Sequence, residues 1–188
     1  MHILLIHQYF WLPGSWGNNR SYAFARAWAE AGHEVTVLTS TAFFPEDHRA
    51  HQRHFTRFRH EGLQILAHRV PYGQKMSAFR RLLAFLQFFL LALWSGWRLQ
   101  RPDVIYACSS PPSVGQAGQL LSRWHRVPFV FETIDVWPDI PIGMGLIEEW
   151  PLGRLINLTV NRIYDRARAI IALSDGMREL IIGHGKRF

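Results

Sequence analysis

The chain has 188 residues, enough for one domain with a sizeable core, and its 48% hydrophobic content excludes an intrinsically disordered protein. A single cysteine, Cys108, excludes an internal disulfide and a cysteine-rich metal site, and it is typical of a reducing compartment. The formal net charge is +7, and its uneven distribution indicates an anionic partner.

The positive charge is concentrated in residues 48–101, where ten Lys and Arg residues stand against one acid, Glu61. A basic surface of this kind is typical of proteins that bind nucleic acid, a phosphorylated ligand or anionic lipid. A solvated surface without a specific partner is the alternative. The apolar run Ile3–Ile6 is too short for the core of a signal peptide, so we expect a cytoplasmic protein.

Strands and helices are expected to alternate along the chain, because short apolar runs are separated by stretches with helical periodicity. The expected strands span residues 2–7, 34–40, 63–70, 103–109, 127–133 and 169–174. The expected helices span residues 20–31, 77–99, 113–126, 152–167 and 175–185, and residues 41–62 are expected to be irregular. This order predicts a doubly wound α/β fold over residues 1–188, with a mostly parallel, Rossmann-like sheet covered on both faces.

Ligands bind such sheets beyond the carboxyl ends of the strands, and two of these ends carry small polar residues. After the first strand, Gly14, Gly17 and Asn18 precede a helix, where backbone amides can approach an anion; an ordinary turn is the alternative. After the fourth strand, Ser109 and Ser110 precede two prolines. Their hydroxyls are candidates to bind a substrate oxygen, or else they cap the following helix.

Carboxylates follow the fifth strand, in the segment FETIDVWPDIPIGMG at residues 131–145. Glu132 and Asp135 lie three residues apart, and a carboxylate near an acceptor hydroxyl can take its proton as a general base. They are the candidate catalytic residues, and Asp139 is a candidate substrate-binding residue. The structural alternatives are a helix cap at Asp135 and an ion pair between Asp139 and an arginine.

Three histidines, His48, His51 and His54, recur at three-residue spacing, but the arginines between them would repel a cation. We therefore predict no metal site.

The expected helix at residues 77–99 contains sixteen uncharged residues, Leu82–Trp97, between basic flanks. They extend for about 24 Å, which is short of the roughly 30 Å hydrocarbon layer. The helix is expected either to pack on the sheet with part of its surface exposed or to lie in a membrane interface; a helix buried on all sides is the alternative. The candidate membrane contacts are Arg80, Arg81, Phe85, Phe88, Phe89 and Trp94.

Four segments, residues 7–40, 101–115, 128–145 and 166–182, together resemble the amino-terminal half of bacterial retaining glycosyltransferases with two facing Rossmann-like domains. These are the group 1, family 4-like enzymes that make surface polysaccharides and lipid-linked glycans. The most specific matches are Asp135-Val-Trp-Pro-Asp139 and the phrase AGHEVTVLT at residues 31–39. The resemblance departs at Ile134, where many relatives have His or Arg.

The resemblance implies that this half holds the acceptor, while a carboxy-terminal domain, in cis or in trans, binds the nucleotide-diphosphate sugar. The cleft would be lined by residues 14–18, Ser109 and residues 132–135. No cofactor is then expected in this domain, and the isolated chain is expected to be inactive.

The resemblance and the basic, apolar helix together predict transfer of a sugar to a lipid-linked or membrane-proximal glycan, such as a polyprenyl-diphosphate-linked acceptor. The expected partners are this acceptor and an anionic membrane surface, with no nucleic acid, and the expected location is peripheral on the inner face of the cell membrane. The alternative is a non-catalytic membrane-docking subunit that recruits a separate donor-binding partner.

Overall fold

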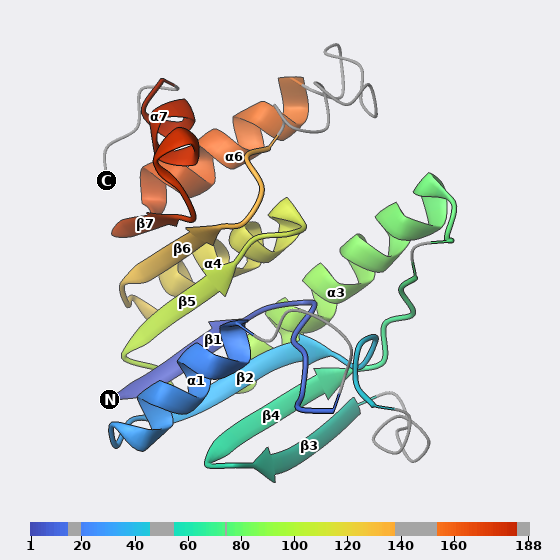
Figure 1. Ribbon diagram of the computed structural model, residues 1–188, viewed down its shortest axis with the longest axis vertical. Coiled ribbons are helices and arrows are strands. Elements are labelled where there is room, and N and C mark those ends of the chain that lie inside the picture. The colour runs from blue at the N-terminus through green and yellow to red at the C-terminus, as the bar shows by residue number, and fades with distance from the viewer. Residues whose placement is uncertain (15–19, 46–54, 74, 138–153, 184–188) are drawn as a thin grey trace.

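The computed structural model describes residues 1–14, 20–45, 55–73, 75–137 and 154–183 (Figure 1). Its centre is a seven-stranded sheet with the strand order β3-β4-β2-β1-β5-β6-β7. All neighbouring strands pair in parallel except β3 and β4. The strands are β1 (His2–Ile6), β2 (Glu34–Ser40), β3 (Phe55–His60), β4 (Leu63–His68), β5 (Val104–Cys108), β6 (Phe129–Thr133) and β7 (Ala169–Ala172).

Helices cover both faces of this sheet, which confirms the predicted doubly wound α/β class (Figure 1). The helices are α1 (Arg20–Glu30), α3 (Ala78–Arg98), α4 (Pro112–His125), α6 (Arg154–Arg166) and α7 (Asp175–Gly183). One core cluster joins one face of the sheet to α1, and the other joins the opposite face to α3, α4 and α6. All five expected helices in the described part of the chain form, with ends within two residues of the expected bounds.

The expectation of an irregular segment at residues 41–62 is wrong over β3. This edge strand alternates exposed and half-buried residues, and it pairs antiparallel with β4. The connection consists of Glu61 and Gly62, whose φ angles of 45° and 83° give the two positive values of a type I′ hairpin turn. The alternation of Arg57, Phe58 and Arg59 before this Glu-Gly pair is the signal that could have predicted the hairpin.

Glycines set the close packing of α4. A Cβ atom at Gly115 would lie 2.5 Å from the ring of Phe131, and one at Gly118 would lie 2.7 Å from the ring of Phe129. Across the helix pair, a Cβ at Gly96 of α3 would lie 2.4 Å from the Leu121 side chain of α4. The missing side chains therefore let α4 press against β5, β6 and α3 at once.

Helix α3 begins at an N-cap, where Ser77 Oγ accepts a hydrogen bond from the backbone N–H of Arg80. It buries only a narrow stripe, formed by Ala84, Phe88, Ala92, Ser95 and Gly96. The alternative of a helix buried on all sides is therefore wrong. By length and composition alone, α3 is apolar enough to cross a membrane, with a mean hydropathy of 1.4, but its buried stripe packs on the sheet and α4.

The expected membrane contact at Phe88 is also wrong, because its side chain is fully buried. Its four-residue spacing from Ala84 and Ala92 places it on the face toward the sheet. Arg80 and Trp94 are exposed, whereas Arg81, Phe85 and Phe89 are half-buried. The exposed face carries instead Phe79, Leu82, Leu83, Leu86, Leu90, Trp94 and Trp97, which are 48–69% exposed.

Candidate functional site

The strand order reverses between β1 and β5, because later strands are added outward on both sides of this pair. In an open parallel sheet, the carboxyl edge at this reversal is where ligands bind. The residues that follow β1 there are His7 and Gln8, and those that follow β5 are Ser109 and Ser110. Residues of β6 and the first turn of α1 complete this edge. We call it the acceptor edge, after the role that the sequence resemblance implies for it.

The carboxylate of Glu132, near the end of β6, is held by the side chains around it, including those of Arg20 and Cys108. The guanidinium of Arg20, the first residue of α1, forms an ion pair with one of its oxygens. The thiol of Cys108, at the end of β5, donates to the other over 2.9 Å. Burial raises the pKa of Cys108, and the Glu132 charge raises it further, so the thiol stays protonated and remains a donor.

Glu132 is 1% exposed, whereas Arg20 is 31% exposed. The arginine therefore covers the carboxylate and presents part of its own cationic side chain to solvent. This arrangement gives Glu132 a fixed position within the sheet and places a positive charge at the acceptor edge. Sequence reasoning missed Arg20, because no local motif marks it; only the folding of α1 over the sheet brings it to β6.

Ser109 and Ser110 tie β5 to the segment after β6. Ser109 Oγ accepts a hydrogen bond from the backbone N–H of Ile134 over 2.9 Å. The backbone N–H of Ser109 donates a hydrogen bond to the carbonyl oxygen of Glu132 over 2.8 Å. The hydroxyl of Ser110 donates to the carboxylate of Asp135. The alternative role as helix caps is wrong, because α4 is preceded by Pro111 and has no side-chain cap.

Asp135 differs from Glu132 in being half-buried, and it bonds to a hydroxyl instead of a cation. Its carboxylate lies where β5 and β6 end, and the segment after Trp137, in which a helix capped by Asp135 would lie, is outside the described residues. Of the two candidate catalytic carboxylates, Asp135 is therefore the one within reach of a ligand at the acceptor edge.

His7 is a second residue that sequence reasoning did not select. Its Nδ1 lies 2.8 Å from the hydroxyl of Ser21 in α1, and both side chains are buried. Burial, and secondarily the charge of Arg20, lowers the pKa of His7 to about 4, so its ring is neutral at physiological pH. The apolar run before it is the signal that could have found it, since the histidine marks the carboxyl end of a buried strand.

The side-chain amide of Gln8, the next residue, is fully buried. Within the described part of the chain, neither its nitrogen nor its oxygen has a hydrogen-bond partner. A buried amide in this state costs roughly 1–3 kcal/mol, and such groups are characteristic of sites that a ligand or an ordered water completes. Gln8 therefore adds a buried polar group without a described partner to the acceptor edge.

An aromatic cluster connects the acceptor edge to α3. Trp11 stacks on Phe43 with ring centroids 4.4 Å apart, and Tyr9 lies 4.7 Å from Tyr72. Tyr72 in turn stacks on Phe85 of α3 at 6.0 Å. The loops after β1, β2 and β4 thus form a continuous aromatic surface that ends on the amino-terminal half of α3.

Gly14 is described and has a φ of 86°, which favours glycine, and it is exposed at the end of the first loop. Gly17, Asn18, Asp139 and the histidines at positions 48, 51 and 54 lie outside the described residues. Among those that are described, no group of three His, Cys, Asp or Glu side chains is arranged to hold a metal ion. The structure thus brings Glu132, Asp135, Ser109 and Ser110 together.

Comparison with known proteins identifies the domain type. A family model described as "Glycosyl transferase 4-like domain" matches residues 17–187. No curated protein matches the chain.

Among solved structures, HepE of Anabaena in complex with UDP-glucose superposes with a TM-score of 0.51 at 16% identity, covering 100% of this chain and 41% of that protein. HepE in complex with UDP and glucose gives 0.50 at 17% identity, covering 100% and 42%. The chain therefore spans about two fifths of the length of HepE, and at this identity the likeness shows the fold.

Proposed function

Because the chain belongs to the glycosyltransferase 4-like domain family, we propose that it is the acceptor-binding half of a glycosyltransferase. The complete enzyme moves a sugar from a nucleotide-diphosphate donor to a lipid-linked or membrane-proximal glycan. A carboxy-terminal domain supplies the donor site, and this half works as a peripheral protein on the cytoplasmic face of the membrane. The chain alone transfers no sugar.

The observation that carries the proposal is the position of α3 beside the acceptor edge. Its 21 residues extend for about 31 Å, whereas the five residues of β5 span about 17 Å. The amino-terminal turns of α3 therefore extend past the carboxyl ends of the strands (Figure 1). This overhang consists of exposed apolar side chains next to Arg80 and Arg81, a pattern typical of helices that lie in a membrane interface.

An acceptor whose lipid lies in the membrane reaches the acceptor edge over the shortest path when α3 rests on that membrane. The aromatic cluster of Tyr9, Trp11, Phe43, Tyr72 and Phe85 joins the two regions, and such rings suit both the apolar stem and the sugar faces of a lipid-linked glycan. The location of the helix thus supports a membrane-proximal acceptor over a soluble one.

The acceptor edge suits the binding of a hydroxyl group. Asp135, oriented by Ser110, accepts a hydrogen bond from the acceptor hydroxyl and takes its proton as the new glycosidic bond forms. Glu132 acts as a positioning residue, since its ion pair fixes Arg20 at the same edge. Arg20, whose side chain is 31% exposed, then offers a cationic contact to the anionic parts of the acceptor.

The experiment is a sugar-transfer assay of the complete two-domain enzyme with a panel of nucleotide-diphosphate sugars and a polyprenyl-diphosphate glycan in vesicles. Asp135→Asn should lower kcat at least 100-fold, which is the usual contribution of a general base. Glu30→Gln, at the end of α1 away from Arg20, should leave kcat unchanged. Unchanged turnover with Asp135→Asn would refute the assigned role. Sugar transfer by the purified 188-residue chain would refute the proposal that the donor site lies in a separate carboxy-terminal domain.

A further inference from the structure

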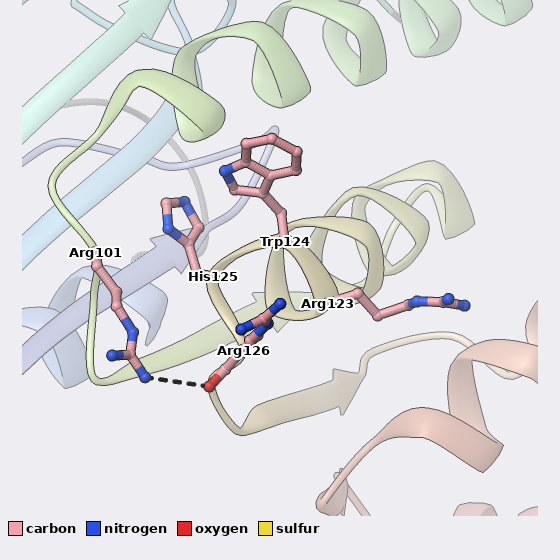
Figure 2. Close-up of a pocket in the computed structure, with 5 residues that line it drawn as sticks. All are labelled: Arg101, Arg123, Trp124, His125 and Arg126. Atoms are coloured by element: carbon pink, nitrogen blue, oxygen red, sulfur yellow. Dashed lines mark hydrogen bonds between the residues drawn. The ribbon is translucent and has the colours of Figure 1, made fainter.

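A second basic site lies at the opposite edge of the sheet, where α3 and α4 end. Arg101, Arg123, Trp124, His125 and Arg126 line a shallow hollow of about 510 Å³ (Figure 2). Arg101 precedes β5 and the other four residues form the end of α4, so the hollow lies at the amino-terminal ends of the strands. It is therefore separate from the acceptor edge.

The hollow has a fixed framework. The Nε2 atom of His125 lies 2.9 Å from the carbonyl oxygen of Gly96, which links the end of α4 to the end of α3. Arg101 Nη2 donates to the carbonyl oxygen of Arg126 over 3.3 Å, as Figure 2 shows. Arg126 itself ends α4 in the left-handed conformation, with a φ of 56°. Two separate chain segments thus meet in the hollow, where the side chain of Arg101 contacts the backbone of Arg126.

In the described parts of the chain, no carboxylate neutralises the arginines of this hollow. Within the described parts of the chain, none of Arg101, Arg123 and Arg126 forms an ion pair with a carboxylate. The nearest acid in sequence, Asp103, instead accepts a hydrogen bond over 2.7 Å from the backbone nitrogen of His2. Arginines gathered without counter-charges favour an anion, and their planar guanidinium groups match the oxygens of a phosphate.

Large apolar side chains border the same hollow. Trp124 is 60% exposed, and its ring meets that of Trp97 edge to face with centroids 5.4 Å apart. Arg98 lies over Trp94 and Trp97, with its guanidinium carbon 4.3 and 5.4 Å from the two ring centroids. Tryptophan beside arginine is typical of the membrane interface, where indole rings lie at the level of the headgroups and cations meet the phosphates.

We propose that this hollow binds the headgroup phosphate of an anionic phospholipid. The inference rests on the proposed docking of α3 to the membrane and extends it to a second contact. The exposed face of α3 runs from the acceptor edge to this hollow, so the helix touches the membrane along its length. Arg80 and Arg81 lie at one end, and the phosphate held between Arg101 and Arg126 fixes the other.

The phosphate in this site is not the diphosphate of the acceptor. Helix α4 starts at the acceptor edge and ends at the hollow, and its 14 residues extend for about 21 Å. A diphosphate bound at the acceptor edge is too short to reach the hollow as well. The hollow therefore orients the protein on the bilayer through a lipid that does not react, and it holds the acceptor edge close to the membrane surface.

The test is co-sedimentation of the whole chain with vesicles of phosphatidylcholine in which one third of the lipid is phosphatidylglycerol. Arg101→Gln with Arg126→Asn removes two guanidinium groups that line the hollow, and Asn suits the left-handed conformation at the end of α4. The matched control, Arg57→Gln with Arg59→Gln, removes the same charge from exposed positions on β3. Circular dichroism and thermal unfolding check that both variants fold.

We expect the hollow variant to lose about 30-fold in vesicle partitioning, from the usual contribution of two interfacial arginines, and the control to lose less than about threefold. Equal losses for the two variants would overturn the phosphate site and leave the docking of α3 intact. Failure of the unaltered chain to bind these vesicles would overturn both proposals. Tighter binding to a DNA duplex than to the vesicles, at the same salt concentration, would overturn the lipid assignment.

Discussion

The ion pair between Arg20 and Glu132 gives a prediction whose magnitude follows from burial. Replacing Arg20 with Met keeps most of the side-chain volume but leaves the Glu132 carboxylate buried without the cation that pairs with it. Breaking a fully buried pair costs about 3–5 kcal/mol. Because Arg20 is 31% exposed, water replaces part of the lost interaction, so we expect a loss of about 2 kcal/mol in the free energy of unfolding.

The assay is urea unfolding followed by tryptophan fluorescence, with a double-mutant cycle. Glu132→Gln removes the buried negative charge that Arg20 compensates. The double variant should therefore lose at least about 1 kcal/mol less stability than the sum of the losses of the two single variants. Arg26→Met is the matched control in the same helix. Arg26 makes two ion pairs that are exposed to solvent and screened by it, so their loss should change the stability little.

Additive effects of the two substitutions would refute the reasoning, because they would show that Glu132 does not depend on Arg20. A loss of stability no greater for Arg20→Met than for Arg26→Met would refute it as well. Either result would also remove the argument that Glu132 positions a cation at the acceptor edge.

Burial and a neighbouring arginine lower the pKa of His7 to about 4 in the folded state, so as the pH falls the unfolded state takes up a proton on this ring before the folded state does. The free energy of unfolding should therefore fall by up to about 3 kcal/mol as the pH is lowered from 6.5 to 4. Urea titrations of His7→Asn should show a weaker dependence on pH. Phe88→Ala should cost about 3–5 kcal/mol of stability, whereas Phe79→Ala, at a position 69% exposed, should leave stability unchanged and weaken vesicle binding. Gly118→Ala should lower the free energy of unfolding by about 1–3 kcal/mol, because the new Cβ would lie 2.7 Å from an aromatic ring of β6. Gly176→Ala has open space around the new Cβ, so it should stabilise the protein by about 0.5–1 kcal/mol through the helix propensity of α7. Thermal unfolding measures both effects.

The sheet was predictable because its strands are short apolar runs with helical stretches between them, and that order restricts the topology. The strand β3 was missed because a solvated edge strand carries charged residues such as Arg57 and Arg59 and lacks a continuous apolar run. Its signal lies in the alternation and the Glu61-Gly62 turn, which are weak unless they are considered together.

The acceptor edge was predictable only in part. The strand-end rule placed Ser109, Ser110, Glu132 and Asp135 together, because all lie near the ends of neighbouring strands. The rule cannot show which carboxylate is buried, since that depends on Arg20 reaching across from another helix. The burial of Phe88 likewise depends on the rotation of α3 about its axis, which composition does not define.

The most direct test of the account is ligand binding by this chain, measured by equilibrium titration with a water-soluble short-chain polyprenyl-diphosphate glycan and, separately, with UDP-glucose. We expect saturable binding of the glycan, weakened at least about tenfold by Asp135→Asn, and no binding of UDP-glucose at the same concentrations. Saturable binding of UDP-glucose that the glycan does not affect would contradict the assignment of this half to the acceptor.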